Sequence, residues 1–295
     1  MNSKKKRQVY PYVLVLPALF AIVVILLYPM ATGLYLSFHQ YKLTKPVDVL
    51  PFIGFSNYIS LFKDRVFYIS ILKTFYWVVF SVGFQALLGL GVALVLNQKF
   101  KGRALVRGIV LVPWVMPTVV AGLIWAWIYD GSFGVLNDVL KRMSLIKENI
   151  QWLGNKSLAL PSLIFTNIWK GYPFFAISIL AGLQAIPKEL YEAAEIDGAS
   201  VWQRFIHITL TQLKNVIFIT TMLRIIWTTN TTDLIFTMTK GGPGYSSHVL
   251  ALYSYLTAWS KLDFGYSSAL AITLLVVMLI IISIYMKMSY KDESL

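Results

Sequence analysis

Six long apolar stretches constrain this chain more than any other feature of its sequence. A helix rises about 1.5 Å per residue and the hydrocarbon core of a bilayer is about 30 Å thick, so about 20 apolar residues make one crossing. Stretches of that length run approximately over Tyr12–Leu36, Ile69–Leu96, Ile109–Tyr129, Leu158–Leu183, Val216–Met238 and Ser268–Met286. We therefore expect an all-α, multi-pass membrane protein with six transmembrane helices.

Composition excludes several other classes of protein. Only 13% of the 295 residues are charged and the mean hydropathy is +0.67, whereas a soluble domain carries about a quarter charged residues. The chain has no cysteine, which excludes thiol chemistry, and its three histidines lie far apart, which disfavours a histidine metal site. The formal charge of +13 comes from basic residues beside the apolar stretches, where membrane lipid accounts for them. Nucleic-acid binding is not expected.

The basic residues also predict the orientation in the membrane. Lys4, Lys5, Lys6 and Arg7 precede the first stretch and place the N-terminus in the cytoplasm. That stretch is longer than the apolar part of a signal peptide, so we expect a retained helix. Alternation then places the basic 99–107 loop and both termini in the cytoplasm.

One polar segment, QAIPKELYEAAEIDGASVWQRFIHITLTQLKN from Gln184 to Asn215, has the pattern of two short helices. Pro187 fits the first turn of the first helix. Gly198 can adopt the left-handed conformation that ends a helix, and Ser200 can cap the next one. We therefore expect a compact helix–turn–helix on the cytoplasmic side, and we call residues 184–215 the coupling segment.

Within it, EAAEIDGAS at 192–200, followed by Phe205, Ile208 and Leu210, resembles the EAA loop of binding-protein-dependent ABC import permeases. The resemblance implies the type I ABC importer permease fold, as one transmembrane domain over residues 1–295 with the coupling segment inside it. In that family the loop seats in a groove of a cytoplasmic ATPase. The residues that the resemblance assigns to ATPase coupling are Glu192, Ala193, Ala194, Asp197 and Gly198. Thr211 and Asn215 stand where that family often has prolines, so the sequence leaves open whether the chain kinks as it enters the next span.

Three further stretches, Arg103–Asn137, Ile168–Pro187 and Arg224–Trp259, resemble the sugar-type, maltose-permease-like branch of that family. This implies a subunit of the bacterial cytoplasmic membrane that translocates a sugar, in particular an oligosaccharide. Its implied partners are a second permease, a cytoplasmic ATPase dimer that holds ATP and magnesium, and an extracellular solute-binding protein, with no cofactor on this chain. Polyol and glycerol-phosphate importers belong to the same family, so the substrate class stays open.

Polar side chains inside the predicted spans are candidates for the transport path, because they are costly in lipid and face the bundle interior. They are Lys73, Gln85, Asn167, Lys170, Arg224, Asn230 and Asp233. We expect Lys73 and Lys170 to extend to the membrane surface, since both lie near predicted outer ends. Arg224 and Asp233 are expected to pair with each other or to bond backbone carbonyls.

Sugar recognition needs aromatic faces together with hydroxyl or amide groups in a largely apolar cavity. The fourth and fifth predicted spans supply both kinds of group. The predicted substrate-path residues are Gly171, Tyr172, Phe175, Trp227, Thr228, Asn230 and Thr231.

The sequence contains no phosphate-binding loop, since the run from Lys240 to Gly244 lacks its spacing and reads as a tight external turn. Two other classes of membrane protein fit the sequence less well. An ion-driven secondary transporter would use Arg224 and Asp233 as coupling groups and would show broken helices in two repeated halves. A membrane-embedded enzyme would show clustered acidic or histidine ligands in its spans. Neither alternative explains the coupling segment.

Overall fold

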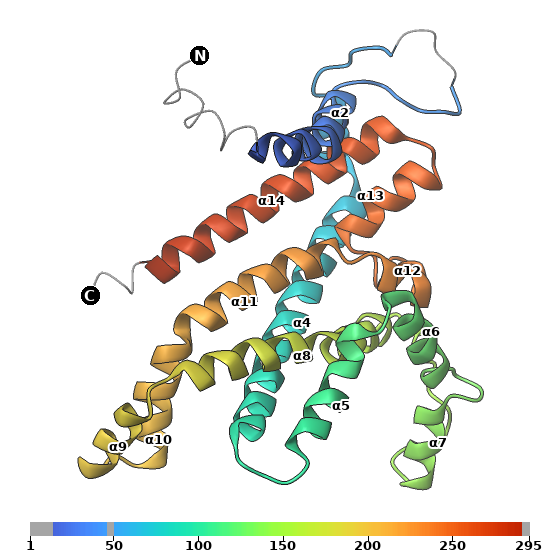
Figure 1. Ribbon diagram of the computed structural model, residues 1–295. Coiled ribbons are helices and arrows are strands. Elements are labelled where there is room, and N and C mark those ends of the chain that lie inside the picture. The colour runs from blue at the N-terminus through green and yellow to red at the C-terminus, as the bar shows by residue number, and fades with distance from the viewer. Residues whose placement is uncertain (1–13, 46–49, 291–295) are drawn as a thin grey trace, which may run out of the picture. The chain divides into compact units, whose positions relative to one another are not determined.

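The computed structural model describes residues 14–45 and 50–290, and there every regular element is a helix, beside two isolated β-bridges. The chain forms two compact units (Figure 1). The first comprises Met1–Asp64 and Tyr253–Val276, and the second comprises Arg65–Leu252 and Val277–Leu295. The basic cluster Lys4–Arg7 lies outside the described residues. An all-α membrane protein is confirmed.

Four of the predicted stretches form single helices that are long and apolar enough to cross a membrane. They are Leu14–Ser37, α4 (Arg65–Asn97), α8 (Ala159–Ala185) and the Phe264–Lys287 part of α14 (Phe264–Tyr290). The first contains a π-helical turn, η1 (Val23–Leu27), followed by α2 (Tyr28–Ser37). None of its most apolar window is buried within the protein, so this helix presents its side chains to lipid or to a partner.

The third predicted span, Ile109–Tyr129, is not one continuous helix. It is divided into α5 (Arg103–Val115) and α6 (Thr118–Ile128), which meet at an angle of 94°. Met116 between them is extended, with φ −62° and ψ 132°, because the ring of Pro117 disfavours helical backbone in the preceding residue. The prolines thus predict a kink correctly, but the angle is so large that the predicted span consists of two helices instead of one.

The fifth predicted span, Val216–Met238, is also divided, into α11 (Thr211–Asn230) and α12 (Asp233–Thr239). Thr231 between them is extended, with φ −72° and ψ 105°. No proline causes this break. The side chains of Asn230 and Thr231 bond to the carbonyls of Ile226 and Trp227 one turn earlier, and such bonds compete with the helical backbone.

In the first unit, hydrogen bonds join the end of α2 to α3 (Ser56–Lys63) and join α13 (Leu250–Trp259) to the start of α14. Asn57 donates to the carbonyl of Ser37 at 2.8 Å. Asp64 accepts hydrogen bonds from the hydroxyls of Tyr253 and Tyr266. These bonds fix segments that are about 200 residues apart in sequence.

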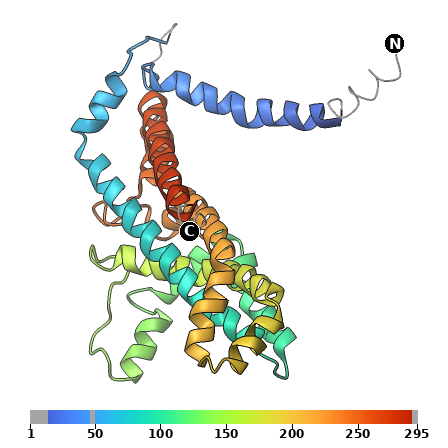
Figure 2. The same ribbon diagram turned by 90° about the vertical axis from the view of Figure 1, so that its left-hand side faces the viewer.

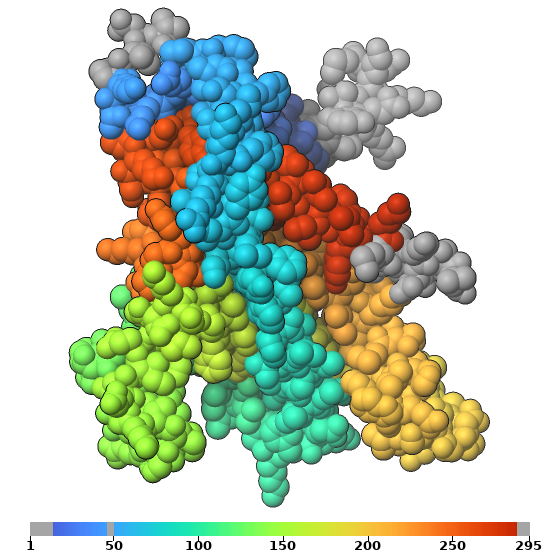
Figure 3. Space-filling view, turned by 180° about the vertical axis from the view of Figure 1, so that it is seen from behind, coloured from blue at the N-terminus to red at the C-terminus, as the bar shows by residue number. Residues whose placement is uncertain are grey.

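In the second unit, α4, α8 and α11 pack around one apolar core that includes Val82, Phe175, Ile179 and Leu213. Figures 1 and 2 show α4 and α8 crossing each other at an angle. Gly89 permits this close crossing, because a side chain there would overlap Phe175 on α8. Seen as a surface, α4 forms a continuous ridge beside the segment that leads into α8 (Figure 3).

Candidate functional site

A polar cavity of about 240 Å³ lies in the second unit, where the breaks in both divided helices meet α8. Its lining comes from α5, α6, α8, α11 and the residue that ends α11. The residues are Trp114, Thr118, Asn167, Lys170, Arg224 and Thr231. Because a broken helix exposes polar backbone and side chains at its ends, both breaks supply polar groups to one place.

Arg224 is buried, with 9% of its surface exposed, and it is held by a relay of side-chain bonds. Its Nε donates to Oε1 of Gln85 at 2.9 Å, and Gln85 Nε2 donates to the carbonyl of Asn167 at 2.8 Å. Gly171 makes room for this pair, since a side chain there would overlap both. The expected pairing of Arg224 with Asp233 is wrong, because among the described residues no ion pair joins them. The guanidinium of Arg224 donates to the side-chain amide of Gln85 instead.

Lys170 does not extend to a membrane surface as expected. Its Nζ donates to the carbonyl of Met116 at 2.5 Å, across from α8 to the break between α5 and α6. The carbonyls that end a helix lack partners within that helix, and a cation there also matches the negative end of the helix dipole. Lys170 is therefore a cap for α5 as well as a lining residue of the polar cavity.

Three aromatic rings form a row beside the polar cavity. The Trp227 and Phe174 ring centroids are 5.0 Å apart, and those of Phe174 and Trp114 are 5.8 Å apart. Trp227 is 43% exposed, so part of this row is open to a ligand. Rings of this kind offer flat apolar faces next to the hydrogen-bonding groups of the cavity.

The predicted substrate-path residues divide between this region and the core. Thr231 lines the polar cavity and Trp227 belongs to the aromatic row, whereas Asn230 is exposed and half-buried Tyr172 lies outside the cavity lining. Phe175 is fully buried in the apolar core, Gly171 is buried against Arg224, and Thr228 accepts a bond from Trp77 through its carbonyl.

Sequence reasoning missed Trp114, Thr118 and Phe174. Each has a signal that could have identified it. Trp114 and Thr118 directly follow Pro113 and Pro117, where a break exposes side chains, and Phe174 lies one turn from Lys170 on α8.

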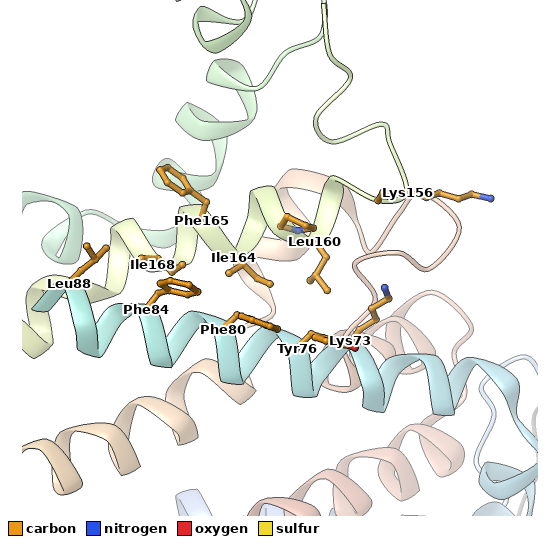
Figure 4. A pocket seen from close by; sticks show the side chains of 12 residues that line it. Lys73, Tyr76, Phe80, Phe84, Leu88, Lys156, Leu160, Ile164, Phe165 and Ile168 are labelled. Atoms are coloured by element: carbon orange, nitrogen blue, oxygen red, sulfur yellow. The ribbon is translucent and has the colours of Figure 1, made fainter. Parts of the chain in front are cut away.

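A second hollow in this unit is an apolar groove of about 870 Å³ between α4 and the start of α8 (Figure 4). Tyr76, Phe80, Phe84, Leu88, Ile164 and Phe165 line most of it, with Lys73 and Lys156 at one end. Few groups there could bond sugar hydroxyls. The polar cavity is therefore the better candidate for a hydrophilic substrate.

The coupling segment forms the expected pair of short helices, which lie beyond the ends of α8 and α11 (Figure 1). They are α9 (Lys188–Ile196) and α10 (Val201–Arg204). Gly198 has φ +76°, and Ser200 forms a capping box with Gln203, as the sequence predicts. Pro187 precedes the first turn instead of occupying it.

Where proline is absent at Thr211, a π-helical turn, η2 (Phe205–Leu210), leads into α11. The chain thus enters α11 through a local change of helical pitch at the position where a proline is common in the family. Tyr191 on α9 bonds to Thr209 in this turn at 2.9 Å, so α9 is joined to the π-helical turn that leads into α11.

The surface of the coupling segment is unusually apolar for a solvent-facing turn. Ile196, Val201 and Trp202 are 87%, 75% and 67% exposed. Of the predicted coupling residues, Glu192, Ala193, Asp197 and Gly198 are exposed and Ala194 is half-buried. Ala194, Asp197 and Gly198 also line a hollow of about 310 Å³ between α9 and α10. Exposed apolar residues around a hollow are typical of a protein-binding surface.

Residues 85–289 match the family model described as the binding-protein-dependent transport system inner membrane component. The chain belongs to this family. It is a permease subunit of an ATP-binding-cassette transporter, a transport protein and not an enzyme.

The permease is similar to proteins of known name over nearly its whole length. It is 39% identical to the sulfoquinovosyl glycerol transport system permease protein SmoG of Agrobacterium fabrum, over 93% of this chain and 88% of that protein. It is 36% identical to the trehalose/maltose transport system permease protein MalF of Thermococcus litoralis, over 94% and 92%.

Among solved structures, the permease resembles a chain of a bacterial ABC transporter involved in the import of the acidic polysaccharide alginate. The TM-score is 0.84 at 27% identity, over 97% of this chain and 96% of that one. A second solved structure, of a bacterial alginate ABC transporter in complex with alginate pentasaccharide-bound periplasmic protein, matches with a TM-score of 0.83 at 25% identity, over 97% of this chain and 96% of that one.

Proposed function

We propose that this permease carries a sugar, in particular an oligosaccharide, through the cytoplasmic membrane of a bacterium, with the polar cavity on the substrate path. The observation that supports this most is the junction of two helix breaks beside the aromatic row of Trp114, Phe174 and Trp227. Aromatic faces next to hydroxyl, amide and cationic groups suit a sugar ring and its substituents. The similarity to SmoG, MalF and the alginate importer supports the same substrate class.

The working assembly in this proposal has four kinds of subunit. A second permease faces this one, a solute-binding protein delivers the sugar from outside, and a cytoplasmic ATPase dimer binds ATP and magnesium. This chain binds no cofactor and crosses the membrane six times, with α5–α6 and α11–α12 as the two broken crossings and both termini in the cytoplasm. The 99–107 loop and the coupling segment then lie on the same cytoplasmic side.

The coupling segment transmits the motion. ATP binding closes the ATPase dimer, which moves α9 and α10 by their exposed apolar residues Ile196, Val201 and Trp202. Because Tyr191 joins α9 to the η2 turn that continues into α11, displacement of α9 moves α11 and therefore Arg224 and Thr231 at the polar cavity. The coupling residues are Glu192, Ala193, Ala194, Asp197 and Gly198.

Uptake of labelled sugar into proteoliposomes tests the path. Trp227→Ala together with Thr231→Ala should raise the sugar concentration needed for half-maximal uptake, while the ATPase still co-purifies. The matched control is Trp259→Ala, since Trp259 is exposed and lies in the other unit. Unaltered uptake by the double variant across all sugar concentrations would remove these residues from the path.

A further inference from the structure

The polar cavity contains more hydrogen-bond donors than the protein itself uses. Arg224 makes one side-chain bond, through Nε, so the N–H groups of its two terminal nitrogens have no partner among the described residues. Lys170 makes one bond, to Met116, and has three N–H groups. The Asn167 Nδ2 group is buried and likewise has no partner in the described part of the chain. A buried donor without an acceptor, such as Asn167 Nδ2, is costly, and Arg224 and Lys170 line the same cavity, so this cluster suits an acceptor from outside the chain.

The charges around the cavity also favour an anionic ligand. Lys170 and Arg224 both line the cavity. Asp233 is the carboxylate that interacts electrostatically with Lys170, but it does not line the cavity. Within the described residues no carboxylate lies within 4.0 Å of either cation. Two cations and one carboxylate leave an excess positive charge in a membrane-embedded position, where an unneutralised charge is expensive.

We propose that the polar cavity binds the anionic group of an acidic saccharide, a carboxylate, sulfonate or phosphate, through Lys170, Arg224 and the Asn167 amide. This deepens the function proposed above and rests on it. Guanidinium suits such groups because its planar N–H groups can bind two oxygens at once. The Trp114 ring and the hydroxyls of Thr118 and Thr231 remain for the sugar that carries the charge.

The size of the cavity limits what part of the substrate it takes. Sites that enclose a drug-sized ligand measure about 300–1,000 Å³, and this cavity measures about 240 Å³. It therefore receives one charged sugar unit of a longer chain, and the remaining units lie along the aromatic row.

The test uses the complete importer in proteoliposomes, with the same solute-binding protein throughout so that differences come from the permease. The probes are an oligouronate, its methyl ester, in which each carboxylate is masked, and glycerol phosphate. Arg224→Gln and Lys170→Gln should each raise the KM for the oligouronate about tenfold and change that for the methyl ester by less than about twofold. Arg224→Lys keeps the charge and should recover part of the loss.

The matched control is Lys73→Gln, which removes a cation from the apolar groove and should leave both KM values unchanged. Co-purification of the ATPase with each variant excludes misfolding. Equal loss for oligouronate and methyl ester, or no loss for either, would overturn the anionic site while leaving sugar import intact. Uptake of glycerol phosphate alone would overturn the saccharide assignment, and failure of the wild-type importer to transport any saccharide would overturn the proposed function as well.

Discussion

The amine of Lys170 on α8 donates to the carbonyl of Met116, 54 residues earlier in the chain, at the point where α5 ends. This bond stabilises a 94° break inside a predicted membrane crossing and at the same time holds a cation in the polar cavity. The break and the site are therefore one structural feature.

The first prediction concerns that break. Pro117→Ala removes the steric reason for the extended conformation of Met116, so α5 and α6 gain freedom to join as one helix and the cavity lining is disturbed. We expect sugar uptake to fall severalfold with the ATPase still bound. Pro113→Ala is the control, because Pro113 lies within the last turn of α5 and its ring restricts Val112, not Met116. Equal uptake by wild type and the Pro117 variant would show that the break does not depend on the proline.

The second prediction concerns the crossing of α4 and α8. A methyl group at Gly89 would overlap the Cβ of Phe175 and lies 3.0 Å from the backbone nitrogen of Ala176, so the helices must separate. Gly89→Ala should cost about 1–3 kcal/mol and lower the melting temperature of the purified complex. Gly91→Ala on the same helix meets nothing within 4 Å and should not destabilise it. Similar melting temperatures for both variants would contradict the packing described.

Much of this architecture follows from sequence and some does not. Length and hydropathy locate α4, α8 and α14 because a continuous apolar helix leaves a clear signal. The division of Val216–Met238 was not predicted, since no proline marks it. It is accompanied by hydrogen bonds from the side chains of Asn230 and Thr231 to carbonyls one turn earlier, and such bonds compete with the backbone bonds of the helix.

For the candidate site, the sequence indicated which kinds of residue line the cavity more accurately than which positions do. Thr231 and Trp227 lie at or beside the cavity, but Phe175 is in the core and its neighbour Phe174 contacts Trp227. A shift of one residue turns a helical side chain by about 100°, so a segment can be assigned to the path without its facing residues being known. Lys170 was named as a candidate but was expected to extend to the membrane surface, because its partner Met116 is far away in sequence.

The third prediction concerns the turn of the coupling segment. Gly198 has φ +76° and open space around it, so substitution strains the backbone without a clash. Gly198→Asp should leave the protein in the membrane but weaken ATPase co-purification and uptake, because it adds charge and bulk to the proposed contact surface. Gly198→Asn, which tolerates this φ and adds no charge, should be milder. Unchanged co-purification and uptake with Gly198→Asp would make the coupling assignment wrong.

The fourth prediction concerns the loop after α7 (Val135–Arg142). Asn137 is buried and its amide bonds Asp130, Ile150 and Trp152, so one side chain fastens a long connection. Asn137→Ala leaves several polar groups unpaired and should destabilise the loop by about 2–3 kcal/mol, seen as faster hydrogen exchange over residues 130–158. Asn149→Ala is the control, because exposed Asn149 makes one side-chain bond, to Ser132. Equal exchange in both variants would contradict this role for Asn137.

The most direct test of the account is sugar uptake by proteoliposomes that contain both permeases and the binding protein, with and without the ATPase dimer. The account predicts uptake only when the ATPase and hydrolysable ATP are present, with no effect of ionophores that collapse ion gradients. Uptake without the ATPase, driven by an ion gradient and abolished by Arg224→Gln or Asp233→Asn, would contradict it and indicate a secondary transporter.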